Sequence, residues 1–419
     1  MLKSRIVRTT TLVRFRQSLG ISMVRACLAL ICVWLFPALP AAQSLDITAA
    51  VIRVDYPTLA PISRFERVPD DLGFAGAALA DEDNGTTGTF LGQTYTTRTV
   101  AVPPEKLDDA LNALLDNGIG LFVVLANAAD VARVAERAAS RDALVLNAQS
   151  TDDALRGDAC RANLLHIAPS RRMLADAVVQ FAGWKQWDQV FLVHGSNPDD
   201  RALADAYRRA VAKFRLDLRG EREFEDTGGS RRTDSGHVLV QRQLPIFMQD
   251  TPRHDVVLTA DESDVFAPYL PFHLWSPRPV LGSGGLRPVN FHAAHEAWGA
   301  TQFQRRFESL TRRYITAEDY QVWLALRVIG EAVTRTSSTD PSALRSYALS
   351  PDFELAAFKG QPVTFRDWNG QMRQPILLYD GRITVSVSPQ DGYLHQTSPL
   401  DTLGVDRPET DCTAFKDIP

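Results

Sequence analysis

Acidic side chains follow directly on a predicted buried strand in the second half of the chain. The strand is the apolar segment 255–260, and the residues after it are Asp261, Glu262, Ser263 and Asp264. Open parallel sheets place their ligand-contacting residues at the carboxyl ends of the strands. Carboxylates at that place suit a cation, a hydroxyl group or a metal ion. The alternative is that these acids cap the next turn and interact with its dipole, and both interpretations can hold.

Other polar side chains follow further predicted strands in the same way. These strand-end candidates are Tyr56, Asn127, Ser150, Thr151 and His194. Hydroxyls and free backbone N–H groups at helix starts suit an anionic group of a ligand. Trp275 would add a stacking wall, although a single aromatic residue is more often part of a core or an ordinary surface. Together with Asp261 and Glu262, these residues form the predicted ligand site.

Common enzyme motifs are absent from the sequence. It contains no nucleophile elbow, P-loop or dinucleotide-binding turn. His292, His295 and Glu296 have a spacing at which a helix could share a metal ion, but an ordinary exposed helix start is the more frequent meaning. Residues 81–85 match a calcium loop only faintly and predict a helix end followed by a turn. We therefore expect a protein that is not an enzyme and that has no resident cofactor or metal.

The elements that position these residues alternate between strands and helices. Predicted strands are 47–54, 95–102, 119–126, 143–147, 189–194, 255–260 and 279–282. Predicted helices are 72–83, 104–116, 130–140, 171–182 and 199–214. This alternation is typical of parallel sheets covered by helices. The pattern restarts after Pro169. A chain of 419 residues is also longer than a single hydrophobic core usually accommodates. The predicted fold class is α/β, with two doubly wound parallel-sheet lobes joined by a hinge.

The last third of the chain has a different pattern. Its predicted helices are 294–314, 316–336 and 341–349, and short β-like segments follow between 363 and 387. We expect lobe 1 to comprise 43–168 plus about 285–365, and lobe 2 to comprise 169–284 plus about 366–390. The segment 391–419, rich in Pro and Asp, is expected to be a tail over the surface of the body.

The first 42 residues predict a secretory signal peptide. They carry six basic residues and no acid, and they include the apolar run 26–40 before Ala41 and Ala42. The alternative is an N-terminal membrane anchor, and the start could be Met1 or Met23. Without these residues the formal charge of −5 becomes −11, which disfavours nucleic acid as a partner. We expect a periplasmic monomer.

Two of the four cysteines remain after the predicted signal peptide. Cys160 and Cys412 would meet an oxidising compartment, where a disulfide is the default expectation. Such a bridge would close a loop of about 250 residues and would stabilise the fold by ~5 kcal/mol in the chain-entropy model. Two buried free thiols are the alternative.

Several segments resemble the type I periplasmic substrate-binding proteins, the leucine/isoleucine/valine-binding class that serves ABC importers. The segment 73–84 resembles their first helix, 147–151 their ligand-facing loop, and 191–194 the first strand of their second lobe. The resemblance covers about residues 46–390. It implies a small ligand between two lobes and an inner-membrane ABC permease as partner. Asn127 and Ser196 begin segments that depart from the amino-acid-binding pattern of this class.

A narrower set of segments resembles one subfamily, the substrate-binding proteins associated with PQQ-dependent alcohol dehydrogenase systems. These segments are 83–88, 275–280, 298–300, 358–360, 365–375 and 400–404. The resemblance implies a metal, a metal chelate or a small oxidised metabolite as cargo. Two other functions are compatible with this resemblance. One is a ligand-sensing receptor, and the other is a calcium- or lanthanide-binding accessory protein of the dehydrogenase.

Overall fold

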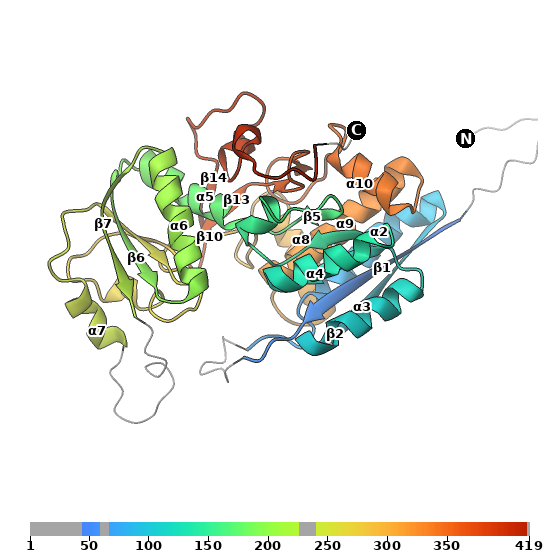
Figure 1. Cartoon of the computed structure of the whole chain (residues 1–419), viewed down its shortest axis with the longest axis horizontal. Coiled ribbons are helices and arrows are strands. Elements are labelled where there is room, and N and C mark those ends of the chain that lie inside the picture. The colour runs from blue at the N-terminus through green and yellow to red at the C-terminus, as the bar shows by residue number, and fades with distance from the viewer. Residues whose placement is uncertain (1–43, 59–66, 226–239, 417–419) are drawn as a thin grey trace, which may run out of the picture. The chain divides into compact units, whose positions relative to one another are not determined.

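The computed structural model describes residues 44–58, 67–225 and 240–416. The predicted signal peptide lies outside these ranges, and so does the polar, glycine-containing segment 227–235, for which the sequence predicts a surface loop. Two parallel sheets organise the described chain, and we call them sheet A and sheet B (Figure 1). Within the described residues, no helix has both the length and the apolar character that a bilayer crossing requires.

Sheet A has five parallel strands in the order β2-β1-β3-β4-β5. The strands are β1 (Leu45–Val54), β2 (Gln93–Val102), β3 (Leu121–Leu125), β4 (Leu144–Asn147) and β5 (Leu164–His166). Successive side chains point to opposite faces, so Val51 packs in one core and Ile52 in the other. The Val51 face is covered by α2 (Phe74–Leu91), and the Ile52 face by α3 (Leu107–Asp116) and α4 (Ala128–Ala139).

Sheet B repeats this arrangement with four parallel strands in the order β7-β6-β8-β9. The strands are β6 (Gln189–Gly195), β7 (Asp217–Phe224), β8 (Val256–Ala260) and β9 (Val280–Gly282). One face packs against α5 (Arg171–Trp184) and α6 (Pro198–Lys213), and the other against α7 (Val240–Phe247). The two parallel sheets with their helix layers confirm the predicted α/β fold class.

The last third of the chain adds helices to sheet A and two groups of short strands. Three helices, α8 (Ala300–Thr311), α9 (Ala317–Thr336) and α10 (Pro341–Leu349), share the Val51 core. The strands are β10 (Arg287–Val289), β11 (Thr364–Phe365), β12 (Met372–Arg373), β13 (Ile376–Tyr379) and β14 (Thr384–Ser388). β10, β13 and β14 form an antiparallel sheet, and Ile376 packs in the core of sheet B. Short 3₁₀ turns complete the described chain: η2 (Pro104–Lys106), η3 (Asp153–Arg156), η4 (Leu270–Phe272), η5 (Pro399–Thr402) and η6 (Arg407–Glu409).

Two predicted helix boundaries are wrong. Helix α2 does not stop at Asn84 but continues to Leu91, because the buried Asn84 donates its amide to the Leu326 carbonyl of α9 at 2.9 Å. The asparagine therefore has a partner that no local pattern reveals. Helix α8 begins at Ala300 rather than at 294, so His292 and His295 precede it.

The C-terminal segment is more deeply embedded than the sequence predicts. Leu403 is fully buried in the core between sheet B and α5, and Phe415 packs in the core of sheet A. The backbone N–H of Gly404 donates to the buried carboxylate of Asp176 at 2.7 Å. The segment therefore belongs to the cores of both sheets and is not merely laid over the surface.

Candidate functional site

A cluster of ion pairs forms around the guanidinium of Arg171, and we call it the Arg171 cluster. Its members are Arg171, Asp152, Asp199 and Glu262. Glu262 binds the guanidinium through both oxygens, at 2.8 Å from Nε and 2.7 Å from Nη2. Asp199 accepts from Nη2 at 2.8 Å and Asp152 from Nη1 at 3.3 Å. Three carboxylates surround one cation, so the cluster has a formal charge of −2.

Burial and ion pairing act in opposite directions on these groups. The side chain of Arg171 is 8% exposed and that of Glu262 28%, whereas that of Asp199 is 70% exposed. Burial raises the pKa of Glu262, and the guanidinium of Arg171 opposes this rise. Burial alone would lower the pKa of Arg171, but its pairs with Glu262, Asp199 and Asp152 raise it above the usual value. The carboxylates therefore hold Arg171 in its charged form, whereas the pKa of Glu262 remains raised because the effect of burial is the larger one.

The residues of the cluster follow the ends of strands in both sheets. Asp152 follows β4 of sheet A, Glu262 follows β8 of sheet B, and Asp199 lies in the first turn of α6, after β6. Arg171 begins α5, and its backbone N–H donates to the Thr151 carbonyl at 2.8 Å. Residues from the two lobes thus meet at the carboxyl ends of their strands, where open α/β sheets bind ligands.

Arg171 was not among the residues that we expected from the sequence. One signal for it exists: a cation in the first turn of a helix opposes the helix dipole, so such a position needs a compensating partner. Arg171 and Arg172 both occupy the first turn of α5, after the N-cap Ser170. The compensating carboxylates come from distant parts of the chain, and the sequence does not reveal that they meet.

Asp261 holds the loop after β8 in place. Its Oδ1 accepts from the N–H of Val265 at 3.0 Å, and its Oδ2 accepts from Phe266 and Ala267, both at 2.7 Å. Burial raises the pKa of Asp261, and these three amides oppose the rise. Both carboxylate oxygens are engaged by the backbone, which is the capping alternative that the sequence left open.

His194 lies in sheet B, and Trp275 lies in the loop before β9. His194 is buried at the end of β6, with Nδ1 2.9 Å from the Gly195 carbonyl and 3.8 Å from a carboxylate oxygen of Glu223. Trp275 is 61% exposed. An indole with that exposure is accessible to a stacking partner, in contrast to the buried imidazole.

Tyr56 and Asn127 come together at the start of α4. The Tyr56 hydroxyl donates to Asp130 at 2.5 Å and accepts from the Asn127 N–H at 3.1 Å. The Asn127 side chain caps the helix by accepting from the Asp130 N–H at 2.9 Å. Burial and the bond to Asp130 raise the pKa of Tyr56. These contacts fix the strand end of β3 locally.

Ser150 and Thr151 lie in a turn that Asn147 organises. The Asn147 Oδ1 accepts from the Ser150 N–H at 2.8 Å, and its Nδ2 donates back to the Ser150 carbonyl at 2.7 Å. Since Asn147 is fully buried at the end of β4, this turn is held by the core. Thr151 then connects directly to the Arg171 cluster through the backbone bond described above.

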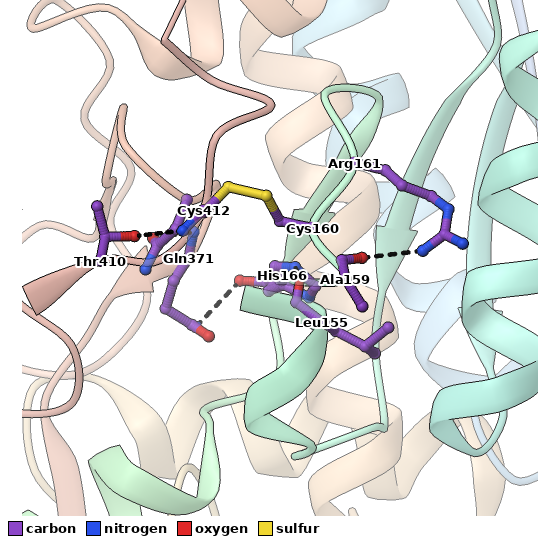
Figure 2. Close-up of a disulfide and its surroundings, with 9 residues drawn as sticks. Leu155, Ala159, Cys160, Arg161, His166, Gln371, Thr410 and Cys412 are labelled. Carbon is purple, nitrogen blue, oxygen red and sulfur yellow. Dashed lines mark hydrogen bonds between the residues drawn. A yellow bond between two sulfur atoms is a disulfide. The ribbon is translucent and has the colours of Figure 1, made fainter. Parts of the chain in front are cut away.

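Buried polar groups join the crossing segments between the two lobes. Arg156 donates to Gln371 Oε1 at 2.8 Å and to the Ala168 carbonyl at 2.8 Å. Gln371 donates to the carbonyl of His166 at 3.2 Å, as Figure 2 shows. Nearby, Cys160 and Cys412 form a disulfide across 252 residues of sequence, the pairing expected from the sequence (Figure 2). The cross-link ties the C-terminal segment to the loop before β5.

The two histidines that could have shared a metal bind a hydroxyl instead. His292 Nε2 lies 2.9 Å and His295 Nδ1 3.1 Å from Thr384 Oγ1. Burial lowers the pKa of both, for His292 to about 4. In the described part of the chain, no three His, Cys, Asp or Glu side chains are placed to hold a metal ion.

Comparison with known proteins gives a fold but no sequence family. No protein-family model matches the chain, and no curated protein does. Solved structures do match, and those described here are type I periplasmic binding proteins of ABC transporters. The chain therefore has the type I periplasmic binding protein fold.

Three of these structures give the extent of the similarity. A periplasmic binding protein from Burkholderia mallei aligns with a TM-score of 0.64 at 13% identity over 90% of this chain and 100% of its own. A branched-chain amino acid ABC transporter ligand-binding protein from Burkholderia xenovorans gives 0.62 at 16%, over 83% and 92%. A solute-binding protein from R. palustris in complex with 4-hydroxybenzoate gives 0.60 at 12%, over 80% and 92%.

Proposed function

We propose that this protein is the periplasmic solute-binding component of an ABC importer. The observation that carries the proposal is the Arg171 cluster, in which Asp152 of one lobe and Glu262 of the other meet on one guanidinium. Its position at the carboxyl ends of the strands is where ligands bind in this architecture. The fold shared with ABC transporter binding proteins supports the same role. Such a protein binds and releases its solute unchanged.

The bound solute would lie between the lobes, against the strand-end residues. Glu262 and Thr151 offer a charged group and a hydroxyl there. Trp275, the expected stacking residue, lies in the loop that leads into the amino end of β9, whereas Glu262 follows the carboxyl end of β8. Tyr56, Asn127, Ser150, His194 and Asp261 would act mainly through the loops that they fix. The formal charge of −2 around Arg171 favours a solute with a cationic or hydroxyl-rich part. Closure on the solute would present the protein to its permease.

The link to PQQ-dependent alcohol oxidation belongs to this proposal. It is supported by sequence segments such as 365–375, which contains the buried Gln371 and Gln374 next to the lobe crossing. The cargo would then be a metal chelate or a small oxidised metabolite. A receptor with the same fold would bind its ligand in the same place. For the metal-accessory alternative, His292 and His295 are engaged by Thr384. The carboxylates of Asp261 and Glu262 are engaged by backbone amides and by Arg171.

Thermal unfolding with a panel of solutes tests the proposal. The panel includes alcohols, organic acids, amines, amino acids, PQQ and calcium or lanthanide salts. A true ligand at 100 times its dissociation constant stabilises the protein by about 2.7 kcal/mol. Glu262→Gln should abolish that shift, whereas Glu221→Gln, in an exposed pair with Arg208, should leave it unchanged. Native mass spectrometry of protein purified from its host would identify the solute. A panel that shifts nothing, with no co-purified ligand, overturns the proposal.

A further inference from the structure

A groove lies at the opposite end of sheet A from the Arg171 cluster, and we call it the Arg345 groove. Its volume is about 530 Å³, within the range of small-molecule sites. It is bordered by Leu144, the first residue of β4, by Asn163, directly before β5, and by the start of α10. The amino ends of β4 and β5 therefore face this groove, whereas the Arg171 cluster follows their carboxyl ends. The two places are separate sites.

The wall of the groove is mostly apolar. Its apolar residues are Ala139, Ala143, Leu144, Ala162, Pro341 and Ala414. Ala143 and Leu144 are buried within the sheet A cores and are held rigidly. Such a wall excludes water from one side of a bound hydrocarbon group and so favours an apolar body of a ligand.

Arg345 brings an uncompensated cation to this wall. Its one described hydrogen bond runs from Nη1 to the Ala162 carbonyl at 3.4 Å, which is long for an N–H···O bond. Its Nε is buried and has no hydrogen-bond partner. Within the described ranges, no carboxylate lies within 4 Å of the guanidinium. The hydrogen bonds of this guanidinium are incomplete, so an anion that accepted from it would be stabilised.

The other charged side chains of the groove differ from Arg345 in their ion pairing and exposure. Arg161 pairs with Glu136 at 3.4 Å and donates to the Ala159 carbonyl at 2.9 Å, the second contact being visible in Figure 2. Asp142 is exposed, and its carboxylate forms no ion pair with the described residues. Arg345 is thus the cation available for a ligand, and Asp142 is the charge that opposes an anion.

We propose that the Arg345 groove binds a small organic carboxylate. The carboxylate would form two parallel hydrogen bonds with the Arg345 guanidinium, whose planar fork matches that geometry. The hydrocarbon part would lie on Ala139, Ala143 and Pro341. Cys160 also borders the groove, so an occupant would contact the loop that the disulfide ties to the C-terminal segment. The site does not depend on the solute proposed for the lobe interface.

Titration with ¹³C-carboxylate benzoate and hexanoate, followed by NMR, tests this proposal on the chain from residue 43 onward. The expected result is submillimolar binding that Arg345→Gln weakens at least tenfold, a change of about 1.4 kcal/mol. Arg345→Lys keeps the charge but loses the fork, so an intermediate loss is expected. Asp142→Asn removes the opposing charge and should tighten binding about twofold. Unchanged thermal unfolding of Arg345→Gln without probe confirms that the variant is folded.

Three outcomes would overturn the proposal. The first is that neither probe binds the unmodified protein at about 10 mM, a concentration that would detect even a weak specific site. The second is that Arg345→Gln binds the probes as the unmodified protein does. The third is that Glu262→Gln abolishes probe binding while Arg345→Gln does not, because the probe would then lie at the Arg171 cluster.

Discussion

The two parallel sheets share a topology but end their strands in different ways. The order β2-β1-β3-β4 of sheet A corresponds to β7-β6-β8-β9 of sheet B. After β3, Asn127 closes the strand end with neutral hydrogen bonds, while the corresponding β8 is followed by Asp261 and Glu262. The buried charge at the lobe interface thus comes mainly from sheet B. Sheet A contributes to this interface the hydrogen-bonded turns after its strands and the acceptor Asp152.

The cross-link is a second difference between the sheets. Cys160 and Cys412 lie on the sheet A side, and the described part of sheet B has no cysteine. Sheet B instead holds the C-terminal segment through Asp176, which Lys213 and Arg209 contact at 2.8 Å and 3.4 Å. The C-terminal segment is therefore attached to sheet A by a disulfide and to sheet B through the ion-paired, buried Asp176.

The largest expected effect on stability comes from removing the Cys160–Cys412 disulfide. Cys160→Ser combined with Cys412→Ser opens a loop of 252 residues and should lower the free energy of unfolding by about 2–5 kcal/mol. Urea unfolding measures the loss, and reduction of the unmodified protein is the matched control. Hydrogen exchange should increase in β5 and residues 405–416 and stay constant in β6 and β8. Equal increases in both sheets would contradict the assignment of the tie to sheet A.

The second effect comes from removing the cation of the Arg171 cluster. Arg171→Met leaves Glu262, Asp199 and Asp152 facing one another and should cost about 2 kcal/mol at pH 7, less than for a fully buried pair because Asp199 is exposed. Arg201→Met removes an exposed pair with Glu223 and should leave the free energy of unfolding nearly unchanged.

The pH dependence gives this variant a specific signature. Burial already raises the pKa of Glu262, and loss of the guanidinium raises that pKa further. A carboxyl group whose pKa is higher in the folded than in the unfolded protein binds more protons when folded, so stability increases as the pH falls. The cost of Arg171→Met should therefore shrink between pH 7 and pH 5. A cost that is constant over this range would show that charge repulsion is not its origin.

The fold could be predicted well from the sequence because its signals are local. The buried runs that became β3 and β8 and the apolar face of α3 are visible as periodicity within about ten residues. The end of α2 was predicted wrongly because the partner of Asn84 is the carbonyl of Leu326, far along the chain. Local patterns contain no information about such a contact.

The candidate site was less accessible from the sequence for the same reason. Strand-end position singled out Glu262, but not its partner Arg171, 91 residues earlier. Asp261 has the same residue type and nearly the same position, yet its oxygens bind backbone amides. Only the path of the loop after β8 distinguishes these two neighbouring carboxylates. The Arg345 groove likewise joins residues from three distant segments.

The third effect tests the role of Asp261 as a loop anchor. Asp261→Asn keeps one acceptor oxygen and replaces the other, which accepts from Phe266 and Ala267, with a donor. At least one buried N–H then has no partner, so we expect a loss of about 1–3 kcal/mol in the free energy of unfolding. Hydrogen exchange of residues 262–268 should increase. Asp250→Asn, at an exposed left-handed position that asparagine tolerates, should change neither quantity. Unchanged exchange in Asp261→Asn would contradict the anchor role.

The smallest expected effect is at the Tyr56 hydroxyl in sheet A. Tyr56→Phe removes the hydroxyl that joins Asp130 to the Asn127 N–H, while Arg133 continues to pair with Asp130 at 2.8 Å. Because the ring remains and the helix cap is intact, the expected loss is about 1 kcal/mol. Tyr314→Phe, 74% exposed, is the matched control and should be neutral. A loss for Tyr56→Phe as large as that for Arg171→Met would remove the contrast between the sheets, because one hydroxyl group in sheet A would then contribute as much as the ion-pair cluster at the lobe interface.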